Sequence, residues 1–94
     1  MVFDLSKVTG IGKYTTKTEK DRTLYIKEDK TFLVINKHTL ELRTDGELKK
    51  LLTEKYESVM ESRYFGRGGI EIVPAGQLSQ DELSDLVRLS YNLS

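Results

Sequence analysis

The sequence predicts an α+β fold, in which an antiparallel β-sheet of about four to five strands packs against two α-helices and most strands precede the first long helix. Short segments rich in Thr, Tyr and aliphatic residues alternate with polar turns in the first half, as in a meander. Two later segments carry apolar residues at helical spacing behind capping residues. The 94 residues have room for a single domain, so we expect residues 1–94 to form one.

The strands follow from alternation and composition. Arg22–Glu28 alternates in polarity, and Thr31–Asn36 is apolar on both faces, which is typical of a central strand. The full set of expected strands is Lys13–Thr18, Arg22–Glu28, Thr31–Asn36, Thr39–Arg43 and Ile70–Val73. Before them, Phe3, Leu5 and Val8 are expected to form a short helical turn.

The first long helix is expected to begin near Asp45 and to end before Arg63. Thr44 and Glu47 have the spacing of a capping box. One apolar stripe is expected on this helix, made of Leu48, Leu51, Leu52 and Tyr56. The glycines around Arg67 (Gly66, Gly68 and Gly69) are expected to form a flexible bend.

The last helix has the clearest local signals. Ser79 and Glu82 fit a second capping box, and Leu78 and Leu83 fit a hydrophobic staple across its first turn. The residues expected to face the core are Leu83, Leu86, Val87 and Ser90.

Composition narrows the class of protein. The chain has 15 basic and 15 acidic residues, which argues against nonspecific nucleic-acid binding by its whole surface. It has no cysteine, which excludes disulfides, thiolate nucleophiles and cysteine-bound metals. It has no apolar run of membrane-spanning length and no secretory signal, so we expect a cytoplasmic protein with no membrane partner.

Leu42 to Leu93 resembles the YjbR/MmcQ-like family in the order and spacing of its segments. Leu42-Arg43-Thr44-Asp45 is similar to the family's strand that runs into a helix, and Tyr64 to Ile72 is similar to its loop and strand. The ending Ser90-Tyr91-Asn92-Leu93 is similar to that of the family's final helix. The resemblance implies a CyaY-like sheet flanked by two helices, with a shortened N-terminal helix, and DNA binding through a proposed double wing.

Arg63, Tyr64 and Arg67 form the first candidate site. Arginine pairs with phosphates, an aromatic ring can stack on bases, and glycine lets a backbone approach a ligand. The alternative is that Tyr64 and Phe65 cap the core beside a simple bend. A second candidate is a basic set that could contact phosphates or could be an ordinary solvated surface: Lys13, Lys17, Lys20, Arg22, Lys37 and Arg43.

Other polar residues favour structural roles. His38 is the only histidine and lies in an expected turn, so we predict no metal site. Asp81 and Asp85 share a helix face with Arg88, and Glu71 alternates outward between Ile70 and Ile72 as a strand surface residue.

Two functions remain open. The first is a cytoplasmic module that binds double-stranded DNA without a cofactor, through Lys37, Arg43, Arg63, Tyr64 and Arg67. The second is a protein-interaction module or homodimer with no nucleic-acid role. No nucleophile–base pair is apparent in the sequence, so we do not expect an enzyme.

Overall fold

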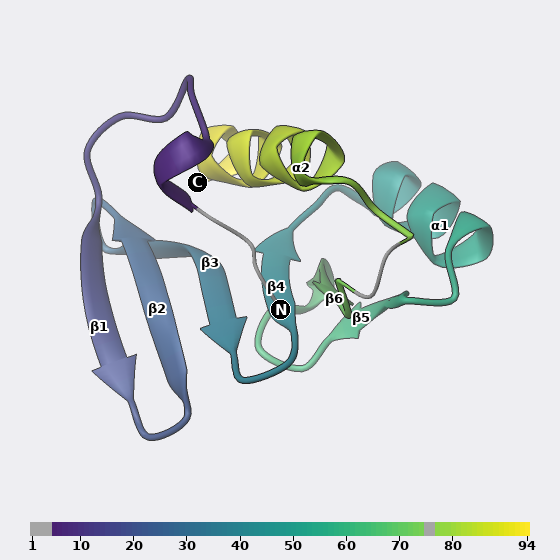
Figure 1. Ribbon diagram of the computed structural model, residues 1–94, viewed down its shortest axis with the longest axis horizontal. Helices are drawn as coiled ribbons and strands as arrows, with labels where there is room; N and C mark the ends of the chain where they lie inside the picture. Colours follow the sequence, from purple (N-terminus) through teal and green to yellow (C-terminus); the bar gives the residue numbers. More distant parts are fainter. Residues whose placement is uncertain (1–4, 75–76) are drawn as a thin grey trace.

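The described residues of the computed structural model, 5–74 and 77–94, form one antiparallel sheet and two α-helices (Figure 1). The sheet has six strands in the order β1-β2-β3-β4-β6-β5. The strands are β1 (Thr15–Glu19), β2 (Arg22–Lys27), β3 (Lys30–Asn36), β4 (Leu40–Arg43), β5 (Val59–Ser62) and β6 (Gly66–Ile72). The helices are the 3-10 turn η1 (Leu5–Lys7), α1 (Gly46–Lys55) and α2 (Gln80–Leu93).

The predicted α+β class, the two helices and the concentration of strands before α1 are confirmed. The predicted count of four to five strands is wrong, because β5 was not expected. Val59–Ser62 is short and begins soon after α1 ends at Lys55, and it becomes a strand by pairing with β6. Of the turn expected near the N-terminus, Leu5 begins η1 and Val8 follows it directly, whereas Phe3 lies outside the described residues.

Both helices contribute to one core on the same face of the sheet. Leu40 and Leu42 of β4 pair with Ile72 and Ile70 of β6, and all four side chains are fully buried there. The α2 residues predicted to face the core are buried. Ser90 also fastens α2 to the sheet, since its hydroxyl accepts from the Arg43 N–H (2.8 Å) and donates to a β3 carbonyl.

The capping box predicted for α2 is present, whereas the one predicted for α1 is wrong. Ser79 and Glu82 exchange both hydrogen bonds of the box. In α1 the N-cap is Asp45, whose Oδ1 accepts from the Leu48 N–H at 2.8 Å. The Thr44 N–H, which a capping box would direct to the side chain of Glu47, donates instead to the Gly68 carbonyl and extends the pairing of β4 with β6 by one residue.

The apolar stripe predicted for α1 is also narrower than expected. Leu48, Leu52 and Tyr56 pack against the core, but Leu51 is 65% exposed. The helix packs chiefly against β5 and β6 at one edge of the sheet, so a narrow apolar face is enough to cover them.

The glycine segment is part of a strand and not a flexible bend. Gly66 has φ +60°, and Gly69 pairs with Arg43 across the β4–β6 ladder. A side chain at Gly69 would meet the Leu42 carbonyl oxygen and would lie 2.6 Å from the Phe65 Cβ. Glycine is therefore needed there for close approach of two chain segments.

Two hairpin turns meet at one end of the sheet. The β1–β2 turn is Lys20–Asp21, and the β3–β4 connection is Lys37–Thr39. Because consecutive strands are antiparallel, both turns lie at the same sheet end (Figure 1). This end carries the candidate site.

Candidate functional site

The site is built on two buried carboxylates. Glu41 of β4 and Glu71 of β6 are direct cross-strand neighbours. They alternate with core residues and so lie on the face opposite the helices, yet each is only 2% exposed. The prediction that Glu71 is a surface residue is therefore wrong. The β5–β6 loop, residues 63–65, folds across this face and removes both carboxylates from water.

Glu41 holds that loop in place. Its Oε1 accepts hydrogen bonds from the Ser62 hydroxyl (2.8 Å) and from the Tyr64 backbone N–H (2.9 Å). Its Oε2 accepts from the Asn36 amide at 2.8 Å. Three donors from β3 and the β5–β6 hairpin thus compensate for the loss of water around this carboxylate.

Glu71 holds Arg63. The guanidinium donates through Nε to one carboxylate oxygen (2.9 Å) and through Nη2 to the other (2.7 Å). Thr39 adds a third donor at 2.8 Å. The hydrogen bonds from Arg63 hold the pKa of Glu71 below its ordinary value, although burial acts in the opposite direction. The same pair raises the pKa of Arg63.

Arg63 itself remains accessible, since its side chain is 77% exposed. Its two bonds to Glu71 use Nε and Nη2, which leaves Nη1 directed to the surroundings. A forked pair fixes the plane of a guanidinium as well as its position. The buried network therefore presents one oriented cation at the surface.

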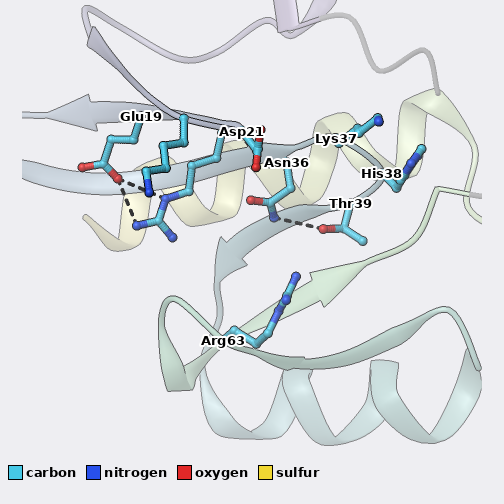
Figure 2. A pocket seen from close by; sticks show the side chains of 9 residues that line it. Glu19, Asp21, Asn36, Lys37, His38, Thr39 and Arg63 are labelled. Carbon is cyan, nitrogen blue, oxygen red and sulfur yellow. Dashed lines mark hydrogen bonds and ion pairs between the residues drawn. The ribbon is translucent and has the colours of Figure 1, made fainter.

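Figure 2 shows that Arg63 points into an open pocket of about 740 Å³. Its walls come from three separate segments: the β1–β2 turn, the β3–β4 turn and the loop after β5. The lining residues are Glu19, Lys20, Asp21, Arg22, Asn36, Lys37, His38, Thr39 and Arg63.

Positive charge prevails in this pocket. Four of the lining residues are lysine or arginine and two are carboxylates. Glu19 is paired with Arg22, with 2.9 Å between Oε1 and Nη2. Within residues 5–74 and 77–94, Lys20, Lys37 and His38 make no hydrogen bond or ion pair through their side chains. Two ammonium groups are thus free to meet an anion beside Arg63.

The residues predicted from sequence fall into three places. Lys37 and Arg63 line the pocket together. Arg43 and Tyr64 both contact Thr31. The Arg43 Nε donates to the Thr31 carbonyl at 2.7 Å, and the hydroxyls of Tyr64 and Thr31 lie 3.2 Å apart. Arg67 is exposed on β6 and does not line the pocket.

Arg43 and Tyr64 are also engaged with other side chains. The Arg43 guanidinium lies 5.0 Å from the centre of the Phe65 ring, and that of Arg22 lies 5.2 Å from the centre of the Tyr64 ring. These contacts support the loop that carries Arg63. We therefore assign Arg43 and Tyr64 to the support of the site and Lys37 and Arg63 to its surface.

Sequence reasoning missed the supporting network of Asn36, Thr39, Glu41 and Glu71. One signal could have indicated it. Both carboxylates stand between two large aliphatic residues, as Leu40-Glu41-Leu42 and Ile70-Glu71-Ile72. A strand with such strongly apolar neighbours lies in the middle of a sheet, where a carboxylate needs a partner.

Metal binding has no support in the part of the chain that the structure describes, where no group of three or more His, Asp or Glu could hold an ion. His38 is an exposed turn residue, as expected. Neither described α-helix has the length and apolar character required to cross a lipid bilayer. Asp85 pairs with Arg88 at 2.7 Å on the exposed side of α2, as predicted.

Comparison of the chain with protein-family models, with curated proteins and with solved structures found no match. The candidate function therefore depends on the geometry of the pocket. An oriented guanidinium with unpaired ammonium groups nearby can bind an anionic oxygen group, such as a phosphate.

Proposed function

We propose that this chain is a small, non-catalytic DNA-binding module that contacts phosphates of double-stranded DNA through the cationic pocket. The observation that carries the proposal is the position of Arg63. Two hydrogen bonds to the buried carboxylate of Glu71 orient its guanidinium toward the pocket, where Lys20 and Lys37 have no carboxylate partner among the described residues.

The shape of the site favours a phosphate backbone as the ligand. Lys20 and Lys37 lie in two different hairpin turns, and Arg63 lies in a third segment, the loop after β5. Cations on separate projecting turns can follow successive phosphates, which position a protein on a duplex without reading its sequence. The resemblance to the YjbR/MmcQ-like family and its proposed double wing favours the same function, and both remain predictions.

The test is a fluorescence anisotropy titration of a labelled DNA duplex at low salt. We expect Arg63→Gln to weaken binding about tenfold, because the exposed guanidinium that Glu71 orients is lost from the pocket. Lys37 lies on an exposed turn, and its side chain makes no hydrogen bond or ion pair with another described residue that a substitution would break. Lys37→Gln should weaken binding about three- to fivefold. The matched control is Lys50→Gln, which removes the same charge from the exposed side of α1.

Folding has to be checked separately for Arg63→Gln, because the variant leaves Glu71 without its main partner. Arg63→Lys keeps the charge but cannot make the forked pair, so it should bind with intermediate affinity. The proposal is wrong if the native protein does not bind duplex at tens of micromolar. It is equally wrong if Lys37→Gln and Lys50→Gln have the same effect.

A further inference from the structure

Thr39 belongs to the same turn as Lys37 and reaches the carboxylate that holds Arg63. It ends the β3–β4 connection and lines the pocket together with both cations. Lys37 and His38 are exposed, whereas Thr39 is half-buried. In Figure 2 its hydroxyl is bonded to the side chain of Asn36 at the end of β3. Thr39 therefore attaches this turn to the interior of the site.

The Thr39 hydroxyl acts as donor and acceptor at the same time. Its oxygen accepts from the Asn36 amide at 2.9 Å, and it donates its one proton to Oε2 of Glu71 at 2.8 Å. The same Oε2 accepts from Nη2 of Arg63. A continuous chain of hydrogen bonds thus joins the β3–β4 turn to the guanidinium that the pocket presents.

Asn36 fixes the other end of this chain. Its backbone N–H donates to the Thr39 carbonyl at 2.8 Å and closes the turn that carries Lys37. Its side-chain amide also donates to Glu41, the second buried carboxylate. Hydrogen bonds to carboxylates that water does not reach are stronger than those at the surface. The backbone of Lys37 is therefore held by the same network that orients Arg63.

We propose that Thr39 is a positioning residue, which fixes the turn of Lys37 relative to the guanidinium of Arg63 so that both cations meet the phosphate backbone together. The proposal rests on the proposed function, because it concerns how the pocket holds its ligand. Thr39 acts through its neighbours and does not itself contact DNA. Without its hydroxyl the turn and Glu71 lose their side-chain link, so the two cations have to be ordered separately when the duplex binds.

The first test compares variants at this position in the anisotropy titration of the DNA duplex. Thr39→Val has nearly the same shape but no hydroxyl, and it should weaken binding about fivefold. Thr39→Ser keeps the hydroxyl and should bind like the native protein. The matched control is Thr16→Val on β1, since Thr16 is exposed and makes no side-chain hydrogen bond within the described residues. Urea unfolding establishes that each variant is folded under the conditions of the titration.

A double-mutant cycle separates positioning from a merely structural role. Lys37→Gln removes one of the two cations, and Arg63→Lys leaves the other without its forked pair. In either background Thr39→Val should weaken binding less than about twofold, because the spacing of the two cations has already lost its effect. In the Lys50→Gln background it should keep its full effect, because Lys50 is on α1 and does not line the pocket.

Equal losses from Thr39→Val in all three backgrounds would overturn the proposal, as would native affinity of Thr39→Val. Affinity of Thr39→Ser as low as that of Thr39→Val would also overturn it, since the hydroxyl would then not be the active group. Each of these results leaves duplex binding by the native protein, and with it the proposed function, intact. Absence of duplex binding by the native protein would instead overturn both.

Discussion

Glu71 is kept ionised by Arg63 and Thr39 in place of water. Its pKa in the folded protein lies below the ordinary value of 4.5, chiefly because of the hydrogen bonds from Arg63. The unfolded chain therefore binds this proton more readily than the folded one. The stabilisation is present above the unfolded pKa and is lost as the pH falls through the lower, folded pKa.

We accordingly predict that Glu71→Gln lowers the unfolding free energy at neutral pH by about 1–3 kcal/mol. The difference from the native protein should shrink as the pH falls below the unfolded pKa of Glu71, and it should vanish once the pH lies below the lower, folded pKa. Urea unfolding at a series of pH values measures this. The control is Glu61→Gln, whose carboxylate also has a lowered pKa from Lys49 but is exposed, so its loss should matter little. Parallel pH profiles for the native protein and Glu71→Gln would contradict the prediction.

Gly69 gives a second prediction at the scale of one residue. Gly69→Ala should destabilise the protein by about 1–3 kcal/mol, because the new methyl group overlaps the Leu42 carbonyl oxygen and the Phe65 side chain. Gly68→Ala is the matched control, since its nearest neighbour would be 3.6 Å away, an ordinary contact. Thermal unfolding of both variants decides the matter, and equal midpoints would refute the account of close approach.

The buried carboxylates mark the limit of prediction from sequence at this scale. Alternation correctly placed Glu71 on the face opposite Ile70 and Ile72, but it cannot say whether that face is covered. That face is covered by the loop of Arg63 and Tyr64, which reaches the two carboxylates only because β5 pairs with β6. Polar residues could be assigned to a face, whereas their burial depended on that tertiary contact.

At the scale of elements, the β1–β2 and β2–β3 hairpin turns both contain residues other than glycine with positive φ, at different positions. Glu28 and Asp29, which join β2 to β3, have φ of +46° and +71°. Both central residues of a type I′ turn need positive φ, and Asn-Gly is the preferred sequence there. We predict that Glu28→Asn with Asp29→Gly raises the unfolding free energy by about 1 kcal/mol and leaves DNA affinity unchanged. A loss of stability in urea unfolding would show that the side chains at this turn have another role.

Lys20 provides the informative contrast. It has φ +31° in the β1–β2 turn and also lines the pocket. Lys20→Gly should relieve the backbone strain and stabilise the protein by about 0.5–1 kcal/mol, while it removes one phosphate contact. Stability and DNA affinity measured on the same variant should therefore move in opposite directions. Higher stability with unchanged affinity would exclude Lys20 from the site.

Elements whose signals are local were predicted well. The start of α2 is set by Ser79 and Glu82 within one turn, so it could be predicted from neighbouring residues alone. The start of α1 was displaced by one residue because the decisive hydrogen bond, from the Thr44 N–H to Gly68, joins distant segments. A strand was expected at Ile70–Val73, but the glycine-rich first half of β6 and its partner β5 were missed for the same reason, since glycine has little strand preference of its own.

On the scale of the whole molecule, the net charge of zero does not favour DNA binding, whereas the local excess of cations in the pocket does. The overall field gives no long-range attraction, so affinity has to come from the few cations that reach phosphates. Among the described residues, Lys20 and Lys37 have no acidic partner, and Arg63 is paired with Glu71 but keeps a side chain that is 77% exposed. The salt dependence of binding counts these contacts, because each one releases a counterion.

We predict that a plot of log affinity against log salt concentration has a slope of about −3, as expected for roughly three phosphate contacts. Lys37→Gln should make this slope shallower by about 0.9, whereas Lys50→Gln should leave it unchanged. Anisotropy titrations of one duplex over a series of NaCl concentrations provide the slopes. A native slope of about −6 or steeper would mean that DNA is bound mainly by a surface outside the pocket. A slope that Lys37→Gln leaves unaltered would mean that the β3–β4 turn makes no phosphate contact, so that any DNA affinity has its origin elsewhere on the sheet.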